Sequence, residues 1–117
     1  MHILNAQQFD KSFLNEIFEA TFWLKTNNRL PELKTKTPIM ASLFYEPSTR
    51  TRFSFESAMI KLGGSILSTE NAEQFSSAAK GEILEDTIRV VSEYSDVIIL
   101  RHSEEGSAER AASVSSV

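Results

Sequence analysis

Cysteine is absent from this chain of 117 residues, and histidine occurs only at positions 2 and 102. The absence of cysteine excludes a disulfide framework, a thiolate metal site and a thiolate nucleophile. Two histidines leave little material for a histidine-based metal centre. A chain without disulfides suits a reducing compartment, and we expect a cytoplasmic location.

Long apolar runs and an excess of positive charge are also lacking. No run approaches the roughly 20 apolar residues of a membrane span, and the start of the chain lacks the basic and apolar regions of a secretory signal. The formal net charge of -4 argues against a nucleic-acid binder, although it is compatible with a local basic site. We therefore expect one small soluble domain with a modest core and with neither a nucleic acid nor a membrane as partner.

Glycine-rich phosphate loops are missing as well. The chain has neither a G-x-x-x-x-G-K-[ST] loop nor a G-x-G-x-x-G segment after a strand, so a generic nucleotide-binding domain is disfavoured. Apolar runs alternate instead with stretches of helical period, which predicts an α/β fold with a parallel sheet and a βαβ unit. The predicted strands cover about 38–44, 65–69 and 96–101, and the predicted helices about 6–26, 49–62, 82–94 and 104–115.

Local signals support several of these elements. Asn5 and Gln8 have the spacing of a capping box at the start of the first helix. Gly63 and Gly64 predict the end of the second helix. Two apolar stripes are expected to pack in the core, rather than to form a cofactor box: Phe9, Phe13, Ile17 and Leu24 in the first helix, and Leu84, Ile88, Val91 and Tyr94 in the third. Residues 70–81 show no apolar periodicity and are expected to form a loop.

The segment that comes after the first predicted strand has the composition of an anion site. Ser48 is a suitable N-cap, so that Thr49 to Thr51 would form the first helical turn. The first turn of a helix carries unpaired N–H groups and the positive end of the helix dipole, which together attract anions such as phosphate. Arg50 lies in this turn, and a guanidinium can hold a phosphate or carboxylate with two parallel hydrogen bonds.

Arg52 is assigned a different role from Arg50. Residues two apart on a helix point about 200° apart, so both arginines cannot face one ligand directly. Arg52 has Glu56 four residues further on and is expected to pair with it at the surface. The segment Ser48-Thr49-Arg50-Thr51-Arg52 also fits a basic helix start that is simply exposed to solvent. Arg101 ends the third predicted strand, and in open α/β sheets ligands bind beyond the carboxyl ends of the strands, so Arg50 and Arg101 are expected at one edge.

These residues carry a family resemblance. The signature of the aspartate/ornithine carbamoyltransferase family resembles Phe44-Tyr45-Glu46-Pro47-Ser48-Thr49-Arg50-Thr51-Arg52. The aspartate branch of that family is similar in two further segments, Lys80-Gly81-Glu82-Ile83-Leu84-Glu85-Asp86-Thr87 and Ile98-Ile99-Leu100-Arg101-His102. The ornithine branch typically carries Lys where Glu46 stands and lacks a pair like Arg101-His102. It remains the alternative.

The resemblance implies transfer of a carbamoyl group from carbamoyl phosphate to the α-amino group of L-aspartate, in the pathway to pyrimidines. The products are N-carbamoyl-L-aspartate and phosphate, and no metal or cofactor takes part. By the same resemblance, carbamoyl phosphate is bound by Ser48, Thr49, Arg50, Thr51 and Arg101. Arg50 would stabilise charge on the leaving group, Thr51 would reach the carbonyl oxygen, and Arg101 would grip the phosphate, so these three are the expected catalytic residues.

The resemblance also implies a homotrimer, with or without regulatory or other subunits, whose active sites lie between subunits. Lys80 and Ser76 would then enter the aspartate side of a neighbouring subunit's site; without the resemblance, Lys80 is expected to be an ordinary loop lysine. Glu46 would orient the arginines. His102 would support Arg101 or take a packing role.

Family members are longer than this chain. The resemblance implies that residues 1–117 are the N-terminal carbamoyl-phosphate-binding domain, truncated at its C-terminal end. A His-Pro-Thr-Gln motif and the whole amino-acid-binding domain would be absent, and the fragment alone is expected to be inactive. A non-catalytic anion-binding or assembly fragment of the same fold is the alternative from another functional class.

Overall fold

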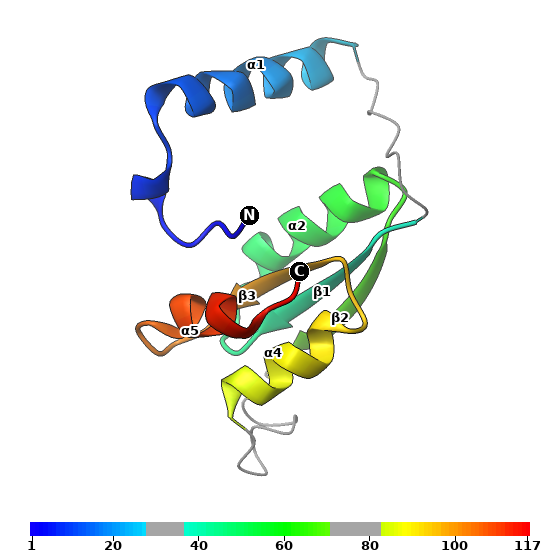
Figure 1. Cartoon of the computed structure of the whole chain (residues 1–117). Coiled ribbons are helices and arrows are strands. Elements are labelled where there is room, and N and C mark those ends of the chain that lie inside the picture. The colour runs from blue at the N-terminus through cyan, green and yellow to red at the C-terminus, as the bar shows by residue number, and fades with distance from the viewer. Residues whose placement is uncertain (28–36, 71–82) are drawn as a thin grey trace. The chain divides into compact units, whose positions relative to one another are not determined.

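The structure is a computed structural model that describes residues 1–27, 37–70 and 83–117 (Figure 1). The chain divides into two compact units, Met1–Glu32 and Leu33–Val117. None of the helices in the described ranges is long and apolar enough to cross a membrane.

The first unit contains a short 3-10 helix, η1 (Ala6–Gln8), and a longer helix, α1 (Lys11–Asn27). The prediction of one helix from about residue 6 is therefore wrong at its start. Asp10 explains the break, because its Oδ1 accepts the Phe13 N–H at 2.8 Å and so caps a new helix. The expected pairing of Asn5 with Gln8 is present at η1, where Gln8 Oε1 accepts the Asn5 N–H at 2.9 Å.

The aromatic stripe of α1 is not covered by other described elements of its own unit. Phe9 and Phe13 stack on each other with ring centroids 5.3 Å apart. Ile17, further along the same stripe, is exposed, and α1 contains no buried residue. The predicted core role of this stripe stays a prediction.

The second unit is built on a parallel sheet of β1 (Ile39–Phe44), β2 (Ser65–Glu70) and β3 (Val97–Arg101), in the order β2-β1-β3. The register pairs Ile39 with Ser65 and Phe44 with Arg101, so the carboxyl ends of all strands lie at one edge. The predicted α/β fold with a parallel sheet is confirmed. The central strand β1 is almost completely buried, as its apolar run predicted.

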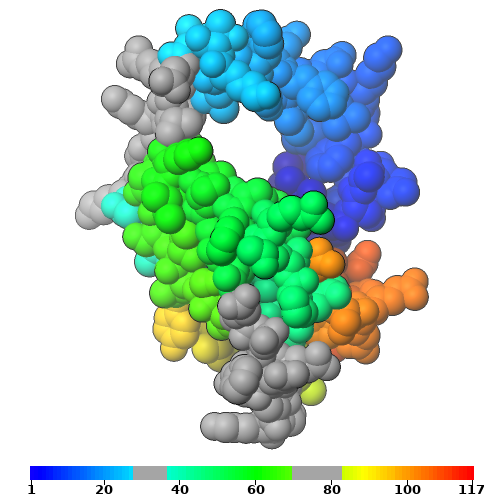
Figure 2. All heavy atoms as spheres, turned by 180° about the vertical axis from the view of Figure 1, so that it is seen from behind, coloured from blue at the N-terminus to red at the C-terminus, as the bar shows by residue number. Residues whose placement is uncertain are grey.

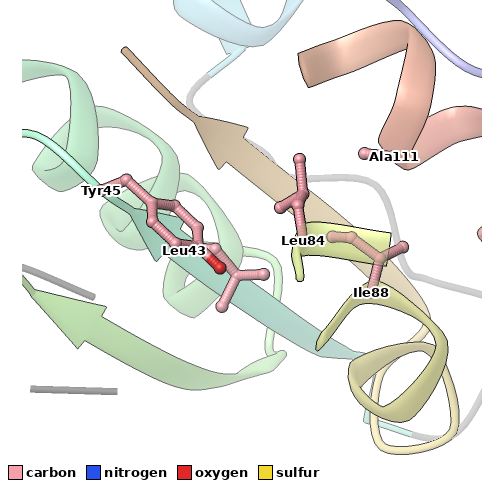
Figure 3. Close-up of a cluster of buried hydrophobic side chains, with 5 residues drawn as sticks. All are labelled: Leu43, Tyr45, Leu84, Ile88 and Ala111. Atoms are coloured by element: carbon pink, nitrogen blue, oxygen red, sulfur yellow. The ribbon is translucent and has the colours of Figure 1, made fainter. Parts of the chain in front are cut away.

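Helices cover the two faces of the sheet (Figure 1). Helix α2 (Thr49–Lys61) packs against β1 and β2 on one face, and α4 (Leu84–Ser92) and α5 (Ser107–Val114) lie on the other. Side chains alternate between the faces of a strand, so β1 serves both layers. The apolar core lies on the α4 and α5 side and contains Leu43, Tyr45, Leu84, Ile88 and Ala111 (Figure 3).

Two sequence predictions on this side of the sheet need correction. Tyr94 was expected in the buried stripe but is 61% exposed, because α4 ends at Ser92 and Tyr94 lies beyond the helix. Helix α5 begins at Ser107 rather than near residue 104, because the turn before it places Gly106 in the left-handed region with φ 80°. Residues 71–81 of the expected loop, and residue 82 of the third predicted helix, lie outside the described residues.

The predicted stop of α2 at Gly63 and Gly64 is confirmed. Gly63 has φ 83°, the left-handed conformation that ends many helices. Gly64 is required for a different reason: a Cβ there would come within 2.8 Å of the Pro38 carbonyl oxygen. The close approach lets β2 begin directly after the helix, since the Ser65 N–H donates to that same carbonyl at 2.8 Å.

An ion pair joins α4 to α5. Arg110 Nε lies 2.7 Å from Glu85 Oε1, and Arg110 Nη2 lies 3.1 Å from Glu85 Oε2, so the guanidinium holds the carboxylate with two parallel bonds. The hydrogen bonds from Arg110 lower the pKa of Glu85 to about 2. Arg110 Nη1 also donates to Glu104 Oε2 at 2.9 Å.

We expect this ion pair to make the second unit sensitive to acid. Because the pKa of Glu85 is lowered from 4.5 to about 2, its ionised form stabilises the fold fully above pH 4.5, and that contribution is lost as the pH falls toward 2. Urea titrations followed at the NMR signal of Ala111 should show a midpoint that drops across this window. In Arg110→Met the drop should be clearly smaller, whereas Arg89→Met, which removes an exposed pair with Asp86 and only a minor charge effect on Glu85, should change the drop little. Equal drops in all three proteins would contradict the assignment.

Candidate anion-binding site

The junction between β1 and α2 leaves backbone N–H groups unused. The Ser48 carbonyl accepts the first helical bond, from the Arg52 N–H at 2.9 Å. The amides of Thr49, Arg50 and Thr51 therefore precede the hydrogen-bonded ladder of the helix, and the described residues provide no partner for them. Ser48 occupies the predicted N-cap position, but its side chain does not cap the helix.

The Ser48 hydroxyl instead accepts a hydrogen bond from Arg101. Its Nη1 donates to Ser48 Oγ at 3.0 Å, and its Nε lies 3.3 Å from Glu46 Oε1. The Arg101 carbonyl accepts the Tyr45 N–H at 2.9 Å, so the backbone of β3 is also tied to the turn after β1. The end of β3 and the start of α2 thus lie at the same edge of the sheet, where the sequence placed them.

The predicted pairing of Arg52 with Glu56 is confirmed, but the pair is half-buried rather than at the surface. The Arg52 and Glu56 side chains are only 15% and 16% exposed, and Arg52 Nε lies 3.8 Å from Glu56 Oε1. That same carboxylate oxygen accepts Ser42 Oγ of β1 at 2.9 Å and Ser68 Oγ of β2 at 2.7 Å. Arg52, Glu56, Ser42 and Ser68 form a polar cluster. This cluster anchors α2 to both β1 and β2.

Sequence reasoning missed the part played by Ser42 and Ser68. A serine in the middle of the apolar run 38–44 was the available signal, because a fully buried hydroxyl needs a partner. Ser42 is 0% exposed, and its partner comes from a helix fourteen residues further along the chain.

Arg50 is exposed, and its side chain has no partner among the described residues. The outer face of α2 lies open at the surface of this unit (Figure 2), where Phe53 is 54% exposed. Lys80 and Ser76 lie outside the described residues, so the structure does not place them. The contacts shown bring the Ser48 hydroxyl and the Arg101 guanidinium to the unused amides at the start of α2. Such a set of donors at the carboxyl edge of a parallel sheet is typical of oxyanion-binding domains of the α/β class.

Comparison with known proteins specifies the family. Residues 1–117 match the family model described as aspartate/ornithine carbamoyltransferase, carbamoyl-P binding domain. The chain belongs to this family. It is 59% identical to aspartate carbamoyltransferase 2, chloroplastic, of Pisum sativum, over 98% of this chain and 30% of that protein.

Solved structures agree with this assignment. The catalytic subunit of M. jannaschii aspartate transcarbamoylase superposes with a TM-score of 0.87 at 42% identity, covering 99% of this chain and 38% of that one. Aspartate transcarbamoylase from Trypanosoma cruzi in complex with carbamoyl phosphate superposes with a TM-score of 0.83 at 36% identity, covering 98% and 36%. The chain therefore spans about a third of the length of these relatives.

We expect Glu56→Ala to loosen α2 from the sheet. The substitution leaves the buried Ser42 hydroxyl without its acceptor, which should lower the free energy of unfolding by about 1–3 kcal/mol. Ser57→Ala is the matched control, because Ser57 lies exposed on the same helix and its hydroxyl donates to the Ser54 carbonyl, and it should change stability by less than about 0.5 kcal/mol. Urea unfolding measures both, and equal stability of the two variants would count against the cluster as the anchor of α2.

Proposed function

We propose that this chain is the N-terminal, carbamoyl-phosphate-binding part of an aspartate carbamoyltransferase. The complete enzyme transfers the carbamoyl group of carbamoyl phosphate to L-aspartate and releases phosphate, a step in pyrimidine biosynthesis. Residues 1–117 form the incomplete first domain, and the amino-acid-binding domain lies in sequence beyond them. Family membership and the short span relative to the relatives support this division.

A single contact carries the proposal. Arg101 Nη1 reaches Ser48 Oγ at 3.0 Å, although the two residues are 53 positions apart in the chain. The contact brings a guanidinium to the point where the amides of Thr49, Arg50 and Thr51 are unused. A phosphate group bound there would have positive charge and N–H donors on two sides.

The chemistry requires placement of donors rather than a nucleophilic side chain. The amine of aspartate attacks the carbonyl carbon, negative charge grows on the carbonyl oxygen, and the bond to phosphate breaks. In our proposal Ser48, Thr49, Arg50, Thr51 and Arg101 bind carbamoyl phosphate. Arg50 and Arg101 neutralise charge on the departing phosphate, and Thr51 donates to the carbonyl oxygen. Such donors act mainly by electrostatic stabilisation of the transition state, and holding both reactants in place adds to it.

We assign the substrate to the aspartate branch rather than the ornithine branch. Glu46 supports this choice, because the ornithine branch typically has Lys there, and a lysine could not accept the bond that Arg101 Nε makes to the Glu46 carboxylate. The named relatives at 59% and 42% identity are aspartate enzymes. Product formation from aspartate or ornithine separates the two branches directly.

The proposed assembly is a homotrimer with active sites shared between subunits. Lys80 and Ser76 would reach the aspartate side of a neighbouring subunit's site. The cytoplasmic location also stays a proposal, since the Pisum sativum relative is named as a chloroplastic enzyme. Size-exclusion mass measurement of the full-length protein tests the trimer.

Arg50→Ala in the full-length protein should lower kcat by about 10²-fold or more, because it removes a donor that acts on charge developing in the transition state. Rates of N-carbamoyl-aspartate formation measure this effect. Arg89→Ala is the control: it removes another exposed arginine, which pairs with Asp86 on α4, and it should leave the rate unchanged. A near-normal rate for Arg50→Ala would refute its proposed role.

The 117-residue chain alone should bind inorganic phosphate without catalysing transfer. Phosphate should shift the NMR signals of the Thr49, Arg50 and Thr51 amides, because these N–H groups have no partner in the described structure. No N-carbamoyl-aspartate should form, since the residues that hold aspartate are expected beyond this chain. Product made by the purified 117-residue chain would contradict the proposal that aspartate is bound by residues beyond it. If phosphate shifts none of these amide signals, the proposed anion site is wrong.

A further inference from the structure

Arg101 is the last residue of β3, and its position depends on the turn between β3 and α5. Within the described sheet β3 pairs only with β1, so one side of the strand lacks a neighbouring strand. The backbone of Arg101 is tied to β1 through its carbonyl, and its guanidinium spans Glu46 and Ser48. The Arg101 side chain is 42% exposed, so packing alone does not hold it.

The next residue, His102, begins a closed turn. Its ring packs against Tyr45, with centroids 4.5 Å apart and planes inclined by 47°. Its Nδ1 accepts the Glu104 N–H at 3.0 Å and lies 3.0 Å from Ser107 Oγ. Ser107 is buried, and its hydroxyl donates to the Glu104 carbonyl at 2.6 Å. The histidine thus joins the strand end to the start of α5.

Arg110 anchors the other side of this turn. Its Nη1 donates to Glu104 Oε2 at 2.9 Å, while its Nε and Nη2 hold Glu85 on α4 at 2.7 and 3.1 Å. A single exposed ion pair contributes little to stability, but a two-bond pair with a guanidinium is geometrically specific. The neighbour of Arg110 on α5, Ala111, lies in the apolar core with Leu84 and Ile88 of α4. The turn is therefore anchored to the apolar core of the unit.

We infer that Arg110 is a positioning residue for the phosphate contact of Arg101. Arg110 fixes the turn 102–106 by joining Glu104 to Glu85. The fixed turn keeps His102 packed against Tyr45, and this keeps Arg101 beside Ser48. This inference rests on the proposed function, in which Arg101 binds the phosphate of carbamoyl phosphate. Arg110 itself touches neither Ser48 nor any other residue of the anion-binding site in the described contacts.

The decisive experiment separates positioning from stability by kinetics of the full-length enzyme. Arg110→Met should raise KM for carbamoyl phosphate by about 3- to 10-fold, because a displaced Arg101 holds the phosphate less well. The kcat of the folded enzyme should fall as well, because Arg101 also acts on charge in the transition state. A merely structural role would lower kcat through loss of folded enzyme and leave KM unchanged. The KM of Arg110→Lys should lie between those of the unmodified enzyme and Arg110→Met, since an ammonium cannot reproduce the two parallel bonds to Glu85.

Two further variants complete the design. Glu104→Gln should raise KM similarly, and combining it with Arg110→Met should add little, because both remove the same connection. Arg89→Met on α4 removes an exposed pair with Asp86 and should leave KM unchanged. An unchanged KM in Arg110→Met, or full additivity of the two changes, would overturn the inference.

A ligand-free measurement distinguishes failure of this inference from failure of the proposed function. The Tyr45 amide donates to the Arg101 carbonyl, so its hydrogen exchange reports the strand end directly. In the 117-residue chain, Arg110→Met should speed that exchange about 10-fold relative to the amides of β1, and Arg89→Met should not. If the unmodified enzyme forms no product but the exchange changes as expected, Arg110 does position the strand end at Arg101, and it is the proposed function that fails. Unchanged exchange overturns the inference whatever the activity.

Discussion

The parallel pairing of β1 with β3 is the constraint on which the site depends. It sets Arg101 opposite Phe44, so a guanidinium from one strand end meets the turn that comes after the other. Parallel strands direct all their carboxyl ends to one edge, and an antiparallel partner would have carried Arg101 to the far end of β1. The hydrogen bond from the Tyr45 amide to the Arg101 carbonyl then extends this pairing into the turn.

The two faces of the sheet contribute in different ways. On the α4 and α5 side, Leu43 and Tyr45 pack with Leu84 and Ile88 (Figure 3). Burial of this apolar surface stabilises the fold, but it is non-directional and does not by itself fix the orientation of a helix. On the α2 side, the Glu56 carboxylate bonds hydroxyls from both β1 and β2. Hydrogen bonds are directional, so this cluster sets the orientation of α2 and therefore the direction of its free amides. A polar cluster thus anchors the helix that carries the candidate anion site.

Prediction from sequence succeeded where the signal was local. The apolar run 38–44 identified the central strand, and Pro47-Ser48 marked the start of α2. It failed where a competing local cap or a distant partner decided the outcome. Asp10 caps α1, so this helix begins at Lys11 rather than near residue 6. Helix α4 ends at Ser92, which leaves Tyr94 exposed to solvent. Arg52 was expected at the surface because its partner Glu56 is held by serines of β1 and β2, which reach Glu56 only after the strands have assembled.

By itself, the sequence determined the order of strands and helices, the strand-to-helix turn with its arginine, and the family signature. Each of these depends on residues close together in the chain, where period, capping and turn preference act directly. Only the tertiary structure decided that Arg101 contacts Ser48, that Glu56 bonds two strands, and that Arg110 joins Glu85 to Glu104. These contacts join residues from separate elements, or from a turn and the helix after it. Their geometry is therefore set by the register and packing of the folded sheet, which no local pattern encodes.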